Sequence, residues 1–369
     1  MKILHVLDDY SNRSGHSTVY IIEGIKQLGH EAEVYTSNVR LSALEPDDSK
    51  SLVKITRFKG IKIFKKAFFP GVIPKILFMT NPDIVHTYVM GYFSTFLTGY
   101  LKPLKKYNLV VFADIDRDVK PHKGILGKMY FNFFLKWPIK QADLIHVFTS
   151  EQKTILVDRT GIDPNKIFVW PSGVDTSKFA RNFDKNKLRK SFGMPNKFII
   201  LNVSSIVRKR RLELILEAIK DLDVCFVHVG AEVDKDYYRY LLNKVDELGI
   251  NDKVKFFGKK YFDELVDFYL ASDIFVLSSS NESFGIPMLE AMAAGLPIIT
   301  TDVGAARDLI EEGKNGFIVD AEDLNKILSR VKKLNLKEMG NVSKEKSKDY
   351  DWNILIPRLE AKYYELIRK

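Results

Sequence analysis

Residues Ile274–Gly304 read IFVLSSSNESFGIPMLEAMAAGLPIITTDVG, and this stretch decides the fold. It begins with an apolar run, Ile274–Leu277, that predicts a buried strand. Gly285 then allows the backbone to turn tightly, and Pro287 suits the first turn of a helix. We expect that helix to stop at Gly295, which is followed shortly by another proline. The stretch therefore predicts a strand, a tight turn and a helix, the repeating unit of a parallel α/β sheet.

The turn between this strand and this helix carries the candidate binding groups. The first N–H groups of a helix are free and partly positive, so a helix that starts at the carboxyl end of a strand suits a diphosphate. Glu290, early in the helix, can accept paired hydrogen bonds from the vicinal hydroxyls of a ribose, and Glu282, in the preceding loop, lies nearer a sugar attached to the diphosphate. The alternative is an exposed loop acid and an ordinary helix acid, but the surrounding strand, turn and helix favour a ligand site.

The two halves of the chain follow the same pattern. In the first half an apolar run, Lys2–Leu7, leads through a polar loop to a helical pattern and then to a strand at Glu33–Thr36. In the second half Phe198–Val203 leads through a basic loop to a helical pattern and the strand Val224–Val229. This is the βαβ unit, so the sequence predicts an α/β protein of two Rossmann-like, doubly wound parallel-sheet domains that face each other across a cleft. The ligand is expected in that cleft.

Length and composition agree with this organisation. A chain of 369 residues, 46% of them hydrophobic, is long enough for two domains. Its single cysteine, Cys225, lies in an apolar run and is expected to be an ordinary core residue. The sequence starts directly with a strand and not with a signal peptide, and no apolar run approaches the roughly 20 residues that span a bilayer. We therefore expect a cytoplasmic protein, either soluble or peripheral on the inner face of the cell membrane.

The net charge of +10 is concentrated in two acid-free stretches of the first half. One lies between Asp48 and Asp83 and the other between Val119 and Ala142, and in both lysines alternate with aromatic residues. Such a mixture fits an anionic membrane surface. It also fits a solvated basic rim over ordinary amphipathic helices, whereas nucleic acid, which would need the same charge, is not expected as a partner.

The glutamate pair and its surroundings resemble the signature of glycosyltransferase family four, retaining enzymes of the GT-B fold with a Glu–seven residues–Glu pattern at the donor site. Glu282 and Glu290 match that pattern. Ser172 replaces the asparagine of the family's Pro-Asn-Gly-Val-Asp motif between the domains. The resemblance spans nearly the whole chain, and its motifs are Gly29–Val34, Pro171–Asp175, Glu282–Glu290, Ala291–Pro297, Asp302–Gly304 and Asn315–Val319.

The resemblance implies that the two domains bind different substrates. Residues 1–173 would form an acceptor-binding domain, residues 174–352 a donor-binding domain, and a C-terminal helix at about 353–369 would pack back on the first. Glu290 would hold the nucleotide ribose, and Glu282, with the N–H groups of Phe284 and Gly285, would hold the donor sugar and its phosphate. The expected donor-binding residues are Gly15, Ser205, Arg208, Arg210, Gly230, Glu282, Ser283, Phe284, Gly285, Ile286 and Glu290, and the expected catalytic residues are Glu282, Arg210 and Asp114.

No metal and no cofactor is expected, since the nucleoside diphosphate sugar is a substrate. In this fold basic side chains and a helix dipole take the place of a divalent cation at the leaving diphosphate. Asp114 and Asp116 have the spacing of a metal-binding pair, but they follow a strand of the acceptor domain. They are therefore interpreted as groups on the acceptor side.

The sequence departs from the family at the diphosphate site. Where the family has Gly-Arg-Leu and then Lys-Gly, this chain has Ser204–Arg211, with Ser205 in place of the arginine and Arg210 in place of the lysine. Arg208 or Lys209 would then supply the missing charge, unless the loop is simply solvated.

A second departure concerns the acceptor side, where many family members have a histidine near the sugar. The strand at Leu109–Phe112 leads here to Asp114 and Asp116, which could accept hydrogen bonds from a sugar hydroxyl. His86, expected to end the strand that begins at Ile84, and His16 are placed on the same side without a chemical role.

The sequence as a whole predicts a retaining glycosyltransferase that moves a sugar from a nucleoside diphosphate sugar to an acceptor hydroxyl. The acceptor is expected to be a glycan or a lipid-linked molecule of cell-surface polysaccharide or glycolipid synthesis. Two alternatives stay open: a sugar nucleotide epimerase of similar fold, and an inactive nucleotide-sugar-binding module.

Overall fold

The computed structural model describes residues 1–11, 17–41, 46–63, 66–115 and 124–368. The chain divides into two compact units, and each is treated by itself below. Unit 1 comprises Met1–Pro171 and Trp352–Lys369, and unit 2 comprises Ser172–Asp351. The division falls two residues before the predicted boundary at 173, and the final helix begins one residue before the predicted 353.

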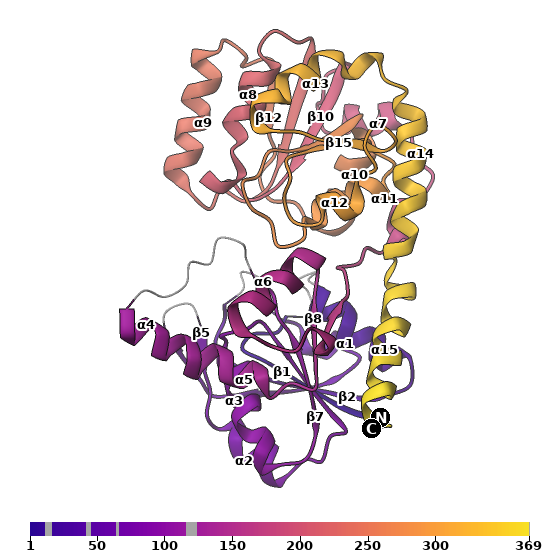
Figure 1. Ribbon diagram of the computed structural model, residues 1–369. Coiled ribbons are helices and arrows are strands. Elements are labelled where there is room, and N and C mark those ends of the chain that lie inside the picture. The colour runs from indigo at the N-terminus through magenta and orange to yellow at the C-terminus, as the bar shows by residue number, and fades with distance from the viewer. Residues whose placement is uncertain (12–16, 42–45, 64–65, 116–123, 369) are drawn as a thin grey trace. The chain divides into compact units, whose positions relative to one another are not determined.

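Unit 1 is built on a parallel sheet of seven strands in the order β3-β2-β1-β6-β7-β8-β9 (Figure 1). Their bounds are Lys2–Leu7 (β1), Glu31–Ser37 (β2), Lys54–Phe58 (β3), Ile84–Tyr88 (β6), Asn108–Phe112 (β7), Leu144–Val147 (β8) and Ile167–Val169 (β9). A separate antiparallel hairpin joins Ile61–Ile63 (β4) to Lys66–Phe68 (β5). Because the order runs outward in both directions from the pair β1 and β6, the sheet is doubly wound, as the sequence predicts.

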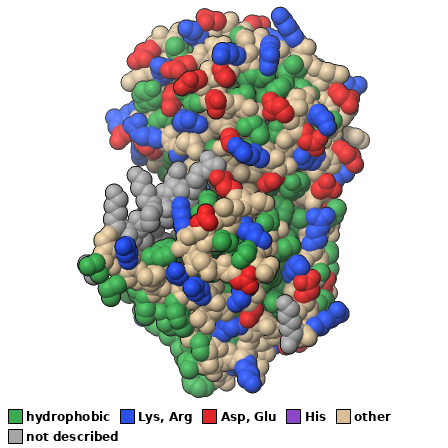
Figure 2. Space-filling view, viewed as in Figure 1, with side chains coloured by type: hydrophobic (Ala, Val, Ile, Leu, Met, Phe, Trp, Pro, Cys, Tyr) green, Lys and Arg blue, Asp and Glu red, His purple; other side chains and the backbone are tan. Residues whose placement is uncertain are grey.

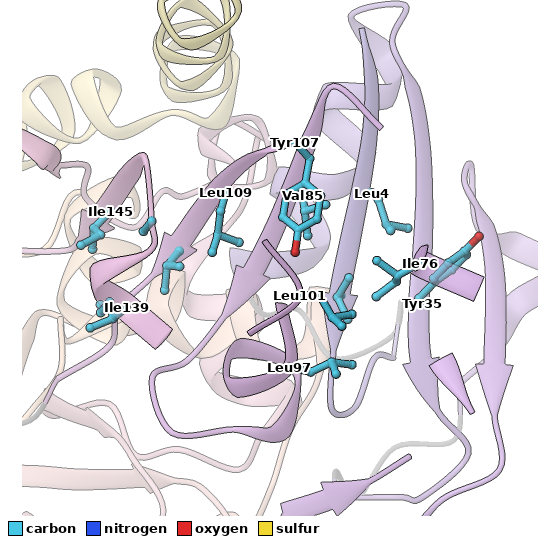
Figure 3. Close-up of a cluster of buried hydrophobic side chains, with 14 of the residues drawn as sticks. Leu4, Tyr35, Ile76, Val85, Leu97, Leu101, Tyr107, Leu109, Ile139 and Ile145 are labelled. Carbon is cyan, nitrogen blue, oxygen red and sulfur yellow. The ribbon is translucent and has the colours of Figure 1, made fainter. Parts of the chain in front are cut away.

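The helices of unit 1 cover both faces of this sheet. They are Ser17–Gln27 (α1), Val72–Phe78 (α2), Phe93–Leu101 (α3), Gly124–Tyr130 (α4), Trp137–Lys140 (α5), Ser150–Thr160 (α6) and Trp352–Ile367 (α15). Leu97 and Leu101 of α3 belong to one buried hydrophobic cluster with the strand residues Leu4, Val85 and Leu109 (Figure 3). Strand side chains alternate between faces, so the neighbours of these residues in sequence point to the opposite face.

Helix α15 lies on that opposite face and ties the end of the chain to its beginning. The Trp170 indole donates a 3.0 Å hydrogen bond to the carbonyl oxygen of Leu355, and the His30 ring contacts the Glu360 carboxylate at 2.6 Å. A side chain at Gly24 of α1 would lie 2.9 Å from Ile356, so the two helices meet in close contact. These contacts explain why the last helix belongs to unit 1 although 180 residues of unit 2 precede it.

Unit 2 contains a six-stranded parallel sheet in the order β12-β11-β10-β13-β14-β15. The strands are Phe198–Val203 (β10), Val224–Val229 (β11), Val254–Phe256 (β12), Ile274–Leu277 (β13), Ile298–Thr300 (β14) and Gly316–Ile318 (β15). Its α-helices are Lys185–Ser191 (α7), Leu212–Ile219 (α8), Lys235–Glu247 (α9), Phe262–Ala271 (α10), Ile286–Ala293 (α11), Ala306–Leu309 (α12), Leu324–Arg330 (α13) and Leu336–Ser347 (α14). The strand order reverses between β10 and β13, so the loops after these two strands meet at the carboxyl edge.

No helix in the described part of the chain is long and apolar enough to cross a membrane. Cys225 is buried in β11 and reduced.

Candidate functional site

The candidate site of unit 2 is formed where the loops after β10 and β13 come together. The Ser278 hydroxyl donates to the backbone carbonyl oxygens of Arg210 and Arg211, at 2.8 and 3.0 Å. In return the Arg211 guanidinium donates to the carbonyl oxygens of Ser278 and Ser279, both at 2.8 Å. Thr301, after β14, adds a 2.6 Å hydrogen bond from its hydroxyl to the carbonyl oxygen of Ser279. Hydrogen bonds thus connect the segments that follow three neighbouring strands of the sheet, β10, β13 and β14.

Arg211 occupies an unusual backbone conformation at this edge. Its φ of 48° lies in the left-handed region, which a non-glycine residue adopts only at a cost of about 1 kcal/mol or more. The conformation ends the short 3₁₀ turn Arg208–Arg210 and turns the chain into α8. Sequence reasoning missed this residue, because nothing in a run of four basic residues distinguishes the one that anchors the loop.

Arg210 and Glu282 form the charged centre of the site. Nη1 of Arg210 donates to Oε1 of Glu282, and the Ser279 hydroxyl donates to the same oxygen at 2.8 Å. Only 17% of the Arg210 side chain and 10% of the Glu282 side chain are exposed. An arginine and a carboxylate on loops 72 residues apart therefore meet in a protected position at the edge of the sheet.

The loop that carries Glu282 is shaped by two glycines. Gly285, with a φ of 91°, precedes α11, and a Cβ there would lie 2.4 Å from Cε of Met288. Gly304, with a φ of 56°, packs so closely that its Cβ would lie 2.5 Å from the carbonyl oxygen of Phe284. The N–H of Ala305 donates to that same oxygen at 2.9 Å. Gly304, in the predicted Asp302–Gly304 motif, therefore packs directly against the loop that carries Glu282.

Helix α11 begins at Ile286 with Gly285 as its N-cap and Pro287 in its first turn. As a glycine, this N-cap residue has no side chain that could cap the first N–H groups. Glu290 is the fifth residue of the helix and so lies in its second turn, slightly further along than the sequence suggested. Its Oε2 accepts a 2.7 Å hydrogen bond from the hydroxyl of Tyr269, which is fully buried in α10.

The buried surroundings of Glu290 disfavour the charged form of its carboxyl group. Burial raises the pKa of its carboxyl group above the usual value, although the Tyr269 hydrogen bond and the nearby Lys178 act in the other direction. Among the described residues Tyr269 is the one donor to Glu290, which leaves Oε1 able to accept a hydrogen bond from a ligand. A half-buried carboxylate with one oxygen fixed and one open suits a neutral hydroxyl pair such as that of a ribose.

The structure places the remaining predicted donor-site residues in different surroundings. Ser205 and Ser283 are half-buried in the two loops, and Ile286 opens α11. Gly230 follows β11, and a Cβ there would lie only 1.7 Å from the carbonyl oxygen of Ser204. Its lack of a side chain is therefore explained by contact with the protein's own backbone.

The Arg208 side chain is directed toward α9 in this structure. Its side chain is exposed, its guanidinium stands 5.7 Å from the centre of the Tyr237 ring, and its Nε lies 4.0 Å from Asp234. Lys209 is likewise exposed. Arg210 is thus the basic side chain of this loop that reaches Glu282.

The acceptor-side predictions fall in unit 1, partly beyond what the structure describes. Of these, His16 and Asp116 lie outside the described residues, as does Gly15, which was predicted to bind the donor. Asp114 follows β7, is half-buried, and accepts a 3.1 Å hydrogen bond from the Gln152 side chain of α6. It therefore lies at the carboxyl edge of the sheet, as expected for a residue two positions after a strand.

The prediction that His86 ends its strand is wrong. Strand β6 continues to Tyr88, and His86 is fully buried at its centre. Its Nδ1 lies 2.7 Å from the hydroxyl of Tyr363 and its Nε2 lies 2.9 Å from Nε2 of His146. Burial, together with His146 and His5, lowers the pKa of His86 well below its ordinary value. The ring is thus part of the core under α15, since both nitrogens are engaged there.

Asp8, which the sequence reading did not single out, lies directly after β1. It is buried and accepts backbone hydrogen bonds from Ser94 at 2.8 Å and from Phe93 at 3.3 Å at the start of α3. Burial raises the pKa of its carboxyl group, while the same hydrogen bonds lower it. The signal that could have found it is an acidic residue immediately after the first strand of a doubly wound sheet.

Comparison with known proteins places these observations in a family. The family model of glycosyl transferases group 1 matches residues 184–350, and that of glycosyltransferase family 4 matches residues 14–178. The sulfoquinovosyl transferase SQD2 of Arabidopsis thaliana is 25% identical over 318 residues, which are 81% of this chain and 59% of that protein. A D-inositol 3-phosphate glycosyltransferase of Geodermatophilus obscurus is 30% identical over 197 residues, half of this chain and 44% of that protein. The matched regions thus span about half the length of these curated relatives.

Solved structures show the same architecture over the whole chain. A glycosyltransferase from Rickettsia africae superimposes with a TM-score of 0.82 at 21% identity, covering 100% of this chain and 99% of that one. HepE of Anabaena, solved in complex with UDP, gives a TM-score of 0.79 at 17% identity and covers 99% of this chain and 100% of that one. The fold is that of the GT-B glycosyltransferases, and the chain belongs to the group 1 glycosyltransferases of family four.

Proposed function

We propose that this protein transfers a sugar from a nucleoside diphosphate sugar to an acceptor hydroxyl with retention of the anomeric configuration. The observation that carries the proposal is the ion pair of Arg210 with Glu282 at the carboxyl edge of the parallel sheet, beside the start of α11, whose second turn carries Glu290. HepE of Anabaena was solved with UDP, with UDP and glucose, and with UDP-glucose, which supports a donor of this class.

We assign the recognition of the nucleotide to Glu290. Its open Oε1 would accept a hydrogen bond from a ribose hydroxyl, while Tyr269 holds the other oxygen in place. Hydrogen bonds to a charged group contribute about 1.5–3 kcal/mol each, so this contact alone accounts for about tenfold to a hundredfold in affinity.

We assign the leaving diphosphate to Arg210 and the start of α11. Arg210 would exchange part of its contact with Glu282 for a phosphate oxygen, so that the negative charge that develops on the diphosphate meets a fixed cation. Glu282, released in part from Arg210, would accept hydrogen bonds from the donor sugar. No metal and no cofactor is required by this arrangement, because arginine and the helix dipole supply the positive charge.

The transfer itself would proceed on one face of the sugar. The acceptor oxygen forms the new bond to the anomeric carbon as the bond to the diphosphate oxygen breaks, and the acceptor proton passes to the departing phosphate. The protein needs no nucleophile of its own for this step. Asp114 of unit 1 is the residue that we assign to the acceptor hydroxyl, and the acceptor is a glycan or a lipid-linked glycan precursor, glycosylated on the cytoplasmic side.

The experiment is a transfer assay of the full-length protein with UDP-, GDP- and ADP-sugars, read by mass spectrometry, with NMR of the product to establish its anomeric configuration. Wild type should consume at least one donor, and Glu282→Ala and Glu290→Ala should each reduce turnover at least a hundredfold while circular dichroism stays unchanged. Near-normal turnover of both variants would overturn the assignment. Isomerisation of the donor without transfer would identify an epimerase instead.

A further inference from the structure

One helical segment of unit 1 exposes an unusual number of large apolar side chains. Helix α4, the π-helical turn Phe131–Lys136 and α5 run without a break from Gly124 to Lys140. Ile125, Met129 and Phe133, spaced four residues apart along it, are 80%, 62% and 52% exposed. Soluble proteins rarely leave side chains of this size so open in a row, and such a row marks a surface that something else covers.

The exposed row is continuous with other apolar side chains. Trp137 stacks on Tyr100 with ring centres 4.1 Å apart, Phe134 stacks on Phe96 at 5.0 Å, and both partners belong to α3. Phe68 of the β4–β5 hairpin meets Phe93 at the start of the same helix, at 4.6 Å. Figure 2 shows hydrophobic side chains gathered along the edge of the molecule over α4 and α5. We call this surface the apolar face; its exposed members are Ile61, Ile63, Phe68, Ile125, Met129, Tyr130, Phe133, Phe134 and Trp137.

The charged side chains of the two segments that form the apolar face are all basic. Lys128, Lys136 and Lys140 accompany the helical segment, and Lys62 and Lys66 lie on the hairpin. Residues 49–82 and 124–142 contain no aspartate and no glutamate. The surface therefore combines protruding aliphatic and aromatic groups with a positive border.

We infer that the apolar face lies in the interface of an anionic lipid bilayer, with Ile125, Met129 and Phe133 inserted below the headgroups. Lysines beside it would meet anionic headgroups, and Trp137 and Tyr130 are of the types that favour the boundary between water and hydrocarbon. A second copy of the chain is a poorer occupant, since a self-complementary contact would place these lysines against one another. Nucleic acid would match the lysines but would leave Ile125 and Met129 without an apolar partner.

Membrane binding itself does not depend on the proposed activity. Its consequence, that the acceptor hydroxyl is carried by a lipid at the bilayer surface, rests on the proposed function. The two are therefore tested separately, binding in the absence of any sugar nucleotide and donor recognition in the absence of vesicles.

The binding test is co-sedimentation of the full-length protein with vesicles of phosphatidylcholine alone or with 30 mol% phosphatidylglycerol, at low and high salt. Wild type should sediment with the anionic vesicles at low salt and bind at least fivefold less to the neutral ones. The triple variant Ile125→Ser, Met129→Ser, Phe133→Ser should lose at least tenfold in vesicle affinity. The matched control is Val233→Ser, Tyr240→Ser, Leu242→Ser, which changes three exposed apolar residues of unit 2 and should bind as wild type does.

The chain contains its own fluorescent reporter for this contact. Trp137 is 36% exposed, whereas Trp170 and Trp352 are 1% and 7% exposed. Anionic vesicles should therefore shift the tryptophan emission to the blue, and Trp137→Phe should remove most of that shift while the protein still sediments.

Three results would overturn the inference: no sedimentation with anionic vesicles, equal binding by the triple variant and its control, or a dimer of the wild type in solution that the triple variant abolishes. The last result would assign the apolar face to a second copy. A thermal-shift response to nucleoside diphosphates that the triple variant retains would show that the donor site is intact. Failure of that response in wild type, with vesicle binding preserved, would count against the proposed function alone.

Discussion

Arg210 and Glu282 form an ion pair between the loops that follow β10 and β13, in a position where little of either side chain is exposed. Removing one partner of such a pair leaves the other charge buried without compensation, which costs about 3 kcal/mol. The same two groups are the ones that a donor diphosphate and its sugar would meet. The pair thus fastens the two loops to each other, and under the proposed function it also supplies contacts to the donor.

A double-mutant cycle on this pair should separate the two roles. Arg210→Met and Glu282→Gln should each lower the free energy of unfolding by about 2–3 kcal/mol, and the double variant should lose less than the sum, because it leaves no unpaired charge. Urea denaturation measures the cycle. Strictly additive losses would show that the two side chains do not interact in solution.

Glu290→Gln should lose function without losing stability. Burial raises the pKa of the Glu290 carboxyl group, so the folded state holds this charge at a cost whenever the pH is above that pKa. A raised carboxyl pKa means that stability falls as the pH rises from the unfolded pKa through the folded one. The glutamine variant removes that cost at pH 7 and keeps an acceptor for Tyr269, so its unfolding free energy should equal or exceed that of wild type. A clear loss of stability at pH 7 would contradict the assignment of Glu290 as a binding group held at a cost.

The support that Gly304 gives to the Glu282 loop can be tested with a matched pair of glycines. Gly304→Ala places a methyl group 2.5 Å from the carbonyl oxygen of Phe284, whereas Gly313, with a φ of 74°, has nothing within 4 Å. Both substitutions carry the strain of a left-handed residue, about 1 kcal/mol, but only the first must also displace the loop. Gly304→Ala should therefore lower the midpoint of thermal unfolding more than Gly313→Ala and should weaken nucleoside diphosphate binding, which the control should not. Equal effects of both substitutions would refute a role for Gly304 in shaping the site.

Buried histidines should make the protein sensitive to acid. Burial lowers the pKa of His5 and of His146 to about 3 and that of His228 to about 4. The unfolded chain binds protons at these histidines below about pH 6.5 and the folded chain does not, so stability is fully present above pH 6.5 and falls as the pH drops toward these values. Each histidine contributes a slope of about 1.4 kcal/mol per pH unit within that window.

Urea denaturation between pH 7.5 and 4.5 measures this dependence. His146→Asn in unit 1 and His228→Asn in unit 2 should each reduce the slope for the unfolding of its own unit. A slope that neither substitution changes would mean that these rings are protonated in the folded state.

Much of the fold could be predicted from the sequence because its signals are local. Apolar runs such as Phe198–Val203 and Ile274–Leu277 marked the strands, and Gly285 with Pro287 marked the start of α11. Parallel pairing and the right-handed crossover then leave few arrangements of such units. The end of β6 was misplaced at His86 because a polar residue usually ends an apolar run, and here the partners that satisfy it, His146 and Tyr363, lie far along the chain.

The sequence could predict only those residues of the candidate site that stand at a characteristic place in a local sequence pattern. Glu282 and Glu290 stand at recognisable positions, but Tyr269, which fixes Glu290, lies in another helix and is one of many tyrosines. The left-handed backbone conformation of Arg211 could not be predicted from the sequence either, since basic residues have no preference for that conformation. Contacts between distant segments decide these features, and no local pattern records them.

The most direct test of the donor site is isothermal titration calorimetry of UDP, GDP and ADP with wild-type protein and with Glu290→Gln. At least one of these nucleoside diphosphates should bind wild type, and its affinity for the variant should be at least tenfold lower, the loss expected for one charge-assisted hydrogen bond. Binding of none of the three, or equal binding to both proteins, would contradict the account of a nucleoside diphosphate sugar held by Glu290.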